Sequence, residues 1–231
     1  MDRNRIYLLI AAGVGAIAVV AVIIIVGSGG SSSSSTTSAV TTTATPTANL
    51  TGVPQKDVTL GRATAPVTVE VFEDPQCPYC KEWNIGTLPS VVKDYVRPGK
   101  IKLVFRGINI IGPNSEVGLR AIYAAGLQNK AWQMADQLYL RQGTENSGWI
   151  NDATISSAAK AAGANVNSIS AAFQTGPVTT MWENARKAAT AYSIQGTPTF
   201  VVQRPPGLPT QLQLSGLDPT SFAAALDPLL Q

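Results

Sequence analysis

The chain has 231 residues, of which 45% are hydrophobic and 13% charged, and its formal net charge is +3, so it is long enough for one sizeable globular domain with additional segments. The mild charge, without basic runs interleaved with aromatic residues, argues against nucleic-acid binding. Histidine is absent, which excludes histidine-based catalytic triads, haem attachment through a Cys-x-x-Cys-His motif and zinc sites with histidine ligands.

The first predicted element is a transmembrane signal-anchor helix over residues 6–26, which carry no charge. A helix of this length extends about 31 Å, close to the ~30 Å hydrocarbon core of a bilayer. Arg3 and Arg5 precede it, and the next charged residue is Lys56. Because positive residues favour the cytoplasmic side, we expect residues 1–5 in the cytoplasm and everything after the helix on the extracytoplasmic side of the cell membrane.

A cleaved signal peptide is the alternative for the same segment. The apolar region of a signal peptide is normally about 7–15 residues long, shorter than residues 6–26, so a retained single-pass anchor is favoured. In both cases the globular part faces an oxidising compartment, in which disulfides persist.

Residues 27–53 follow as a low-complexity tract rich in Ser, Thr and Gly. Such a composition buries too little apolar surface to fold, so the tract predicts a flexible linker between the membrane and the globular part. Asn49 begins a formal N-glycosylation sequence, Asn-Leu-Thr, but we favour an unmodified linker.

The globular part is predicted over residues 54–231 and begins with a strand, a helix and a second strand. Residues 65–74 are β-branched and apolar and are bounded by prolines, which is typical of a buried strand. A helix starts at Pro78, is interrupted near Gly86 and Pro89, and ends near residue 97. Residues 100–108 form the next strand. A strand, helix and strand within about 40 residues indicate a βαβ unit with parallel strands and a right-handed crossover.

A helical block is predicted from about residue 112 to 195, because apolar residues recur there at helical spacing. Residues 198–203 then form a strand, and the alternating residues 210–216 form its hairpin partner. Asp218 is expected to cap a final helix over 219–230. The order β-α-β, helical block, β-β-α predicts an α/β fold of the thioredoxin type with an inserted helical domain.

Cys77 and Cys80 are the two cysteines of the chain, and they lie where the first strand enters its helix. A structural zinc site needs four ligands, so a zinc or iron–sulfur site would have to be shared between two chains. A purely structural disulfide is also disfavoured, because closing a four-residue loop is worth only about 2 kcal/mol.

Reversible thiol–disulfide chemistry fits this motif best. Pro78 suits the first helical position, which makes Cys77 the N-cap, facing free backbone N–H groups and the positive end of the helix dipole. Both effects lower the pKa of Cys77, so Cys77 is the expected nucleophile. Cys80 lies one turn further in and resolves the mixed disulfide. The Cys77–Cys80 disulfide is then the redox centre, and no metal or other cofactor is expected.

Thr197 and Pro198 form a second motif at the start of a predicted strand. A proline is tolerated there, and a Thr–Pro bond is a candidate cis peptide. In a thioredoxin fold this loop lies opposite the two cysteines, so the Thr197 backbone is expected to bind an extended substrate. An ordinary proline at a strand start is the alternative interpretation.

Three acidic residues, Glu70, Glu73 and Asp74, precede the cysteines. A buried carboxylate close to the resolving cysteine could carry its proton. Glu70 is the predicted candidate because it lies in the middle of an apolar strand, although a paired or edge-exposed carboxylate is the alternative. Asp74 is expected to cap or turn the loop between strand and helix.

The stretches VTVEVFEDPQCPYCKEW, YVRPGKIKLVFR and GTPTFVV together resemble the DsbA-like family of extracytoplasmic thiol–disulfide oxidoreductases, in its membrane-anchored form. The resemblance covers about residues 54–231. It implies Cys77 as nucleophile, Cys80 as resolving thiol and Pro198 in the cis form. It also implies exported proteins with cysteines as substrates, and reoxidation by a quinone-linked membrane protein of DsbB or VKOR type.

The residues between the cysteines, Pro78 and Tyr79, depart from the strongly oxidising members of that family, which have a histidine there. Tyr79 offers no positive charge to a thiolate, so the disulfide is expected to be less oxidising. A disulfide donor is favoured, and a reductase or isomerase of exported proteins is the alternative. A third hypothesis is a tethered peptide-binding module or chaperone without redox activity.

Overall fold

The computed structural model describes residues 48–231. The predicted cytoplasmic residues 1–5, the predicted transmembrane helix 6–26 and the linker up to residue 47 lie outside the described residues. Within residues 48–231, no helix is both long enough and apolar enough to cross a bilayer.

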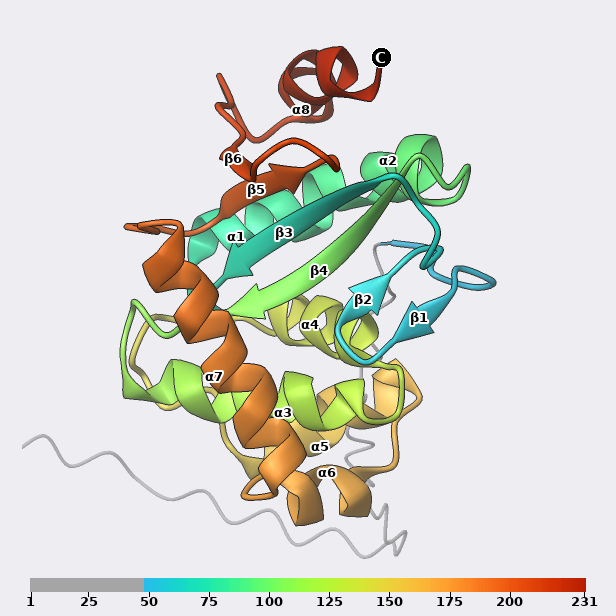
Figure 1. The fold of residues 1–231 in the computed structure, drawn as a ribbon. Helices are drawn as coiled ribbons and strands as arrows, with labels where there is room; N and C mark the ends of the chain where they lie inside the picture. The colour runs from blue at the N-terminus through green and yellow to red at the C-terminus, as the bar shows by residue number, and fades with distance from the viewer. Residues whose placement is uncertain (1–47) are drawn as a thin grey trace, which may run out of the picture. The chain divides into compact units, whose positions relative to one another are not determined.

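A single mixed sheet forms the centre of the described part of the chain (Figure 1). Its six strands have the order β1-β2-β4-β3-β5-β6 within residues 48–231. The central strands β3 and β4 are parallel, with Val67 opposite Ile101, as the βαβ pattern predicted. The strands are β1 (Gln55–Lys56), β2 (Thr59–Leu60), β3 (Val67–Glu73), β4 (Ile101–Gly107), β5 (Thr199–Gln203) and β6 (Thr210–Gln211).

The crossover between β3 and β4 is helical from Pro78 to Val96. It consists of α1 (Pro78–Glu82) and α2 (Leu88–Val91), each followed by a π-helical turn. The irregularity falls near Gly86 and Pro89, where the sequence predicted an interruption, because proline cannot donate a helical hydrogen bond.

The inserted helical block is confirmed, and in Figure 1 most of it lies below the sheet, while its last helix runs back across the strands towards β5. Local sequence sets its boundaries. The side chains of Asn151 and Asn165 cap two of the helices by accepting backbone N–H groups, and Gly163 ends one of them in the left-handed region. The helices are α3 (Pro113–Gly126), α4 (Ala131–Leu140), α5 (Asp152–Ala162), α6 (Val166–Ala172) and α7 (Gly176–Ala191).

The C-terminal segment agrees with its predicted order but has shorter elements. β6 covers two residues of the predicted strand 210–216. Asp218 caps α8 (Pro219–Leu226), because its carboxylate accepts the N–H groups of Thr220 and Ser221. A 3₁₀ turn replaces the end of the predicted helix over Asp227–Leu230.

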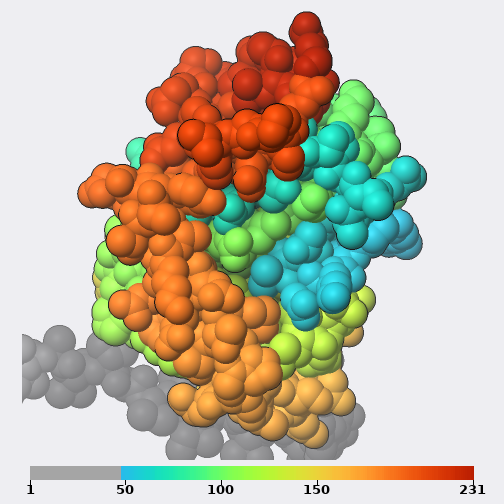
Figure 2. All heavy atoms as spheres, in the orientation of Figure 1, coloured from blue at the N-terminus to red at the C-terminus, as the bar shows by residue number. Residues whose placement is uncertain are grey.

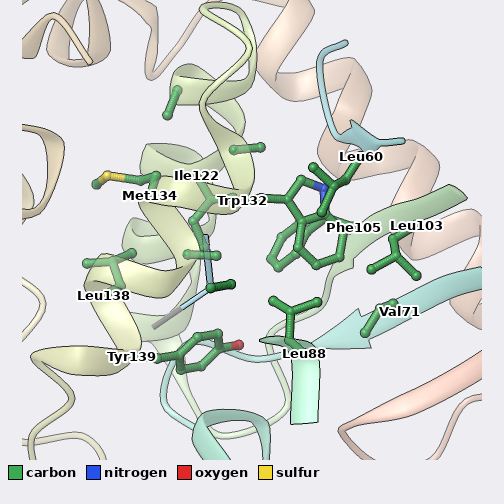
Figure 3. Packing of buried hydrophobic residues seen from close by; sticks show 14 of the residues in the cluster. Leu60, Val71, Leu88, Leu103, Phe105, Ile122, Trp132, Met134, Leu138 and Tyr139 are labelled. Carbon is green, nitrogen blue, oxygen red and sulfur yellow. The ribbon is translucent and has the colours of Figure 1, made fainter. Parts of the chain in front are cut away.

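One hydrophobic core joins the sheet to the insertion (Figure 3). Phe105 of β4 packs edge-on against Tyr123 of α3 and Trp132 of α4, with ring centroids 6.0 and 6.1 Å apart. Large aromatic side chains bury the most apolar area per residue, so the insertion is packed against the sheet through its own α3 and α4.

The structured part begins before the predicted boundary at residue 54. Ala48, Leu50 and Val53, which the sequence assigned to the linker, are buried against the domain. Arg97 also donates a hydrogen bond to the carbonyl oxygen of Asn49 (2.6 Å). These three apolar residues could not be recognised in the sequence, because they are too few and too far apart in residues 27–53 to form a periodic pattern.

Candidate active site

The two cysteines lie at the junction of β3 and α1, as predicted. Cys77 is the N-cap of α1 and has extended backbone angles, and Pro78 occupies the first turn. Both thiols are free in this structure. The side chain of Cys77 is 4% exposed and that of Cys80 is fully buried, so Cys77 is the sulfur that an incoming thiolate reaches first.

The Thr197–Pro198 loop lies directly against Cys77. The peptide bond between Thr197 and Pro198 is cis, as predicted. The Cys77 thiol donates a hydrogen bond to the carbonyl oxygen of Thr197 (3.2 Å). The fold therefore brings two motifs 120 residues apart in sequence into contact, and both belong to the predicted set of site residues.

Hydrogen bonds to its thiolate lower the pKa of Cys77 from 9.0 to about 6. The largest contribution comes from the Cys80 thiol, and further ones come from the Thr197 side chain and from the backbone N–H groups of Tyr79 and Cys80 at the helix start. Burial opposes these effects. At neutral pH Cys77 is thus mainly a thiolate. A thiolate is the form of cysteine that attacks a disulfide, and it is also the leaving group when a mixed disulfide is broken.

Cys80 has the opposite character. Its burial raises the pKa of the thiol well above 9.0, and the hydrogen bond with Cys77 and the charge of Glu73 act in the same direction. Cys80 therefore holds its proton at neutral pH and has to exchange it with a neighbour whenever the disulfide opens or closes.

Glu73 is that neighbour, at the last position of β3. Its carboxylate accepts hydrogen bonds from the Trp83 indole (3.0 Å) and the Tyr139 hydroxyl (2.7 Å). Burial nevertheless raises the pKa of Glu73 from 4.5 to about 8, and the charge of Cys77 adds to this. A carboxyl group that titrates near neutral pH can both give and take a proton.

Glu70, the predicted proton carrier, is a paired carboxylate in the structure, which was the alternative interpretation. Glu70 forms an ion pair with Arg106 and accepts a hydrogen bond from Tyr192 (3.1 Å). Glu73 is three positions after Glu70 in the strand, an odd number, so the two side chains point to opposite faces of β3. The strand is apolar on both faces, which left no alternation in the sequence to show which carboxylate faces the helix.

Asp74 fixes the loop between β3 and α1. One oxygen of its carboxylate accepts the N–H of Gln76 (2.8 Å) and the hydroxyl of Ser115 (2.6 Å). The other accepts the N–H groups of Ile110 and Ile111 (2.8 and 2.9 Å). The turn role predicted for Asp74 is confirmed.

The insertion also holds this loop, through residues that the sequence did not reveal. Gln142 donates to the carbonyl oxygens of Pro75 (2.9 Å) and Cys77 (3.0 Å). Asn146 exchanges hydrogen bonds with the side chain of Gln76. These partners lie 65 to 70 residues apart in the sequence, in a polar loop without a recognisable motif.

Tyr79, between the two cysteines, is 62% exposed. Its side chain lies on the surface, and no cationic side chain stands between Cys77 and Cys80 in the sequence. The thiolate is thus stabilised by hydrogen bonds rather than by a neighbouring positive charge.

Comparison with known proteins gives the same picture. A family model described as thioredoxin matches residues 54–204. A probable disulfide bond formation protein D of Bacillus cereus is 34% identical over 96 residues, which are 41% of this chain and 44% of that protein. The match thus spans less than half the length of this curated relative.

Solved structures show the same fold. The oxidised form of BdbD from Bacillus subtilis superposes with a TM-score of 0.65 at 21% identity, over 77% of this chain and 97% of that one. The thiol-disulfide exchange protein alpha-DsbA2 from Wolbachia pipientis gives a TM-score of 0.58 at 19% identity, over 77% of this chain and 87% of that one. The thioredoxin fold with a helical insertion and the predicted resemblance to DsbA-like proteins are confirmed.

Proposed function

The chain belongs to the thioredoxin family, and from this premise we propose that it is an extracytoplasmic thiol–disulfide oxidoreductase that donates its Cys77–Cys80 disulfide to exported proteins. The observation that carries the proposal is the difference between the two sulfurs. Cys77 is stabilised as a thiolate at the start of α1, whereas Cys80 is buried and keeps its proton. The disulfide itself carries the two electrons, so no other cofactor is needed.

The proposed reaction has two steps. A substrate thiolate attacks the Cys77 sulfur, the Cys77–Cys80 bond breaks, and Cys80 leaves as a thiolate that takes a proton from Glu73. A second substrate thiolate then attacks the substrate sulfur of the mixed disulfide, and Cys77 leaves as a stabilised thiolate. The substrate loses two electrons and two protons and gains a disulfide. The protein gains the two electrons and ends with Cys80 as a thiol and Cys77 as a thiolate, and Glu73 regains its proton from water.

The Thr197–Pro198 loop is proposed to align the substrate. Its backbone lies beside Cys77, where an extended peptide can pair with it in the manner of an added strand. Pairing would hold the substrate sulfur within reach of Cys77, so that the exchange proceeds as a step within the bound complex and not as a random collision.

The membrane anchor and the reoxidising partner of the proposal rest on the sequence. Residues 6–26 would anchor the chain in the cell membrane, with the catalytic domain on the extracytoplasmic side. A quinone-linked membrane protein of DsbB or VKOR type would restore the disulfide. The names of the similar proteins, which concern disulfide bond formation and exchange, support this setting.

The test is the reduction potential of the full chain, purified in a mild detergent and equilibrated with glutathione buffers at pH 7. Alkylation of free thiols followed by mass measurement gives the reduced fraction. A stabilised Cys77 thiolate favours the dithiol, so we expect a potential above about −200 mV, on the side of known disulfide donors. A lower value would contradict the donor role.

A reductase is the second candidate, and one observation favours it. Tyr79 supplies no positive charge to the Cys77 thiolate, which makes the dithiol less stable than in a motif with a cationic residue. A potential below about −250 mV would support this candidate. A Cys77→Ser variant that retained the full cellular activity would instead support the peptide-binding hypothesis.

A further inference from the structure

A hollow with a volume of about 570 Å³ lies between the loop after β4 and the C-terminal half of α7, and it has no role in the reaction described above. One wall is the loop after β4, with Ile108 and Ile110. The other wall is the C-terminal half of α7 and the following Ile194. In Figure 1 this end of α7 passes in front of the ends of β3 and β4, and Figure 2 shows α7 along the surface of the molecule.

Both walls are fixed to the reactive loop. The N–H of Ile110 bonds to the Asp74 carboxylate (2.8 Å), and the carbonyl oxygen of Asp74 accepts the N–H of Cys77 (3.0 Å). Ile194 precedes Thr197 by three residues, which is at most about 11 Å of extended chain. A substrate paired with Thr197 would therefore place side chains near its own cysteine over the hollow.

The hollow has a mixed lining, in which Asn109 and Thr190 are polar and three isoleucines form an apolar part, here called its apolar floor. Ile110 is 45% exposed, which is unusual for a large aliphatic side chain in this domain, and Ile108 is buried beneath the surface. Ile194 is half-buried. An apolar side chain of a substrate would cover this surface and remove it from water.

The rim carries two cations that are consecutive in the sequence of α7. Arg186 and Lys187 are exposed, and the ion pairs formed within residues 48–231 join Arg106 to Glu70 and Arg120 to Glu116. The guanidinium of Arg186 lies over the Trp182 ring, 5.5 Å from its centroid. Glu183 is the carboxylate of the same rim, so the two unpaired cations outweigh it.

We propose that this hollow binds the substrate polypeptide next to its reacting cysteine and favours a segment in which an apolar residue stands beside acidic residues. The proposal rests on the thiol–disulfide exchange function and adds a substrate class to it. The apolar floor provides contact area, and the unpaired Arg186 and Lys187 select the charge of the partner.

The test compares two dithiol peptides that differ only in charge. In each peptide the first cysteine is flanked on both sides by leucine and two charged residues, which are aspartates in one peptide and lysines in the other. The oxidised full chain in detergent is mixed with each peptide, and the loss of peptide thiols gives the second-order rate constant. We expect the acidic peptide to react about fivefold faster at low ionic strength, and the ratio to approach one in high salt.

Charge reversal identifies the surface responsible. The double variant Arg186→Glu, Lys187→Glu should invert the ratio between the peptides. The matched control Lys56→Glu, Lys160→Glu reverses two exposed lysines outside the hollow and should leave the ratio unchanged. Thermal unfolding checks that both variants are folded. An equal ratio in the wild type and the Arg186/Lys187 variant would overturn the proposal.

The apolar floor has its own comparison. Ile110→Ser should lower the second-order rate constant for the acidic peptide with leucine. It should not change the rate constant for an acidic peptide with glycine in place of leucine. Leu127→Ser is the control, because Leu127 is 42% exposed and lies outside the hollow. If the wild-type protein oxidises neither peptide, the proposed function fails. If it oxidises both peptides equally at low salt, the function stands and the substrate site fails.

Discussion

Replacing Glu73 with glutamine is expected to stabilise the protein and slow its reaction at the same time. Burial raises the pKa of Glu73 from 4.5 to about 8, so the folded protein binds this proton more tightly than the unfolded chain does. The stability that the bound proton gives to the folded state is fully present below pH 4.5 and is lost as the pH rises through 8. At neutral pH the folded wild-type protein therefore bears the free-energy cost of keeping Glu73 protonated, because the unfolded chain ionises it at this pH. The Glu73→Gln variant has no such cost.

The size of the effect follows from the same shift. The difference between the two pKa values corresponds to about 5 kcal/mol over the whole pH range, of which about 3 kcal/mol is lost at pH 7. Glutamine keeps one carbonyl oxygen for the two donors, Trp83 and Tyr139, so about 1 kcal/mol of hydrogen bonding is lost. We expect the free energy of unfolding to rise by about 2 kcal/mol at pH 7 and to fall by about 1 kcal/mol at pH 4, where only the hydrogen-bond loss remains.

Denaturant unfolding of the reduced full chain in detergent at both pH values measures this difference. Glu70→Gln is the matched control, because Glu70 stands on the opposite face of the same strand and pairs with Arg106, so its replacement should give no gain at pH 7. In exchange assays, Glu73→Gln should slow the opening of the Cys77–Cys80 disulfide about 100-fold, since the amide cannot supply a proton. A variant that is no more stable than the wild type at pH 7 would refute the assignment of Glu73 as a protonated buried acid.

Two further predictions concern the neighbours of Glu73. The ultraviolet absorbance of the Cys77 thiolate should titrate near pH 6, and a midpoint near 9 would contradict the hydrogen-bonded thiolate. Because folding lowers the pKa of Cys77, the thiolate contributes stability to the folded state that is present above pH 9 and is lost as the pH falls through 6. Tyr139→Phe removes a donor to Glu73, so the pKa of Glu73 should rise further and the pH dependence of exchange should move to higher pH. Tyr123→Phe, which removes an equally buried hydroxyl that bonds to Gly107, should leave that pH dependence unchanged.

The parts of the site that the sequence predicted depend on local chemistry. A proline after Cys77 and a strand before it are enough to place that sulfur at the start of a helix, and the spacing to Cys80 is one helical turn. The cis Thr197–Pro198 bond was predicted from the residue types together with the order of elements. These features need no knowledge of how distant segments pack.

Other features could not be predicted, for two different physical reasons. The strands Gln55–Lys56 and Thr59–Leu60 are two residues long, which is too short for an alternation of polar and apolar side chains to show. Strand β3 is buried on both faces, as parallel central strands usually are, so its sequence did not distinguish Glu70 from Glu73. Only the packed structure shows which face meets the helix.

The insertion is part of the redox site and not only a cover for the thioredoxin fold. Tyr139 at the end of α4 bonds to Glu73 with its hydroxyl, and Figure 3 shows the ring at the end of α4 nearest the sheet. Three residues after Tyr139, Gln142 donates a hydrogen bond to the carbonyl oxygen of Cys77. One short segment of the insertion therefore contacts both the residue that carries the proton and the residue that forms the mixed disulfide. Because Tyr139 stabilises the ionised form of Glu73, a change in the packing of α4 alters the proton supply of Cys80 without touching either cysteine.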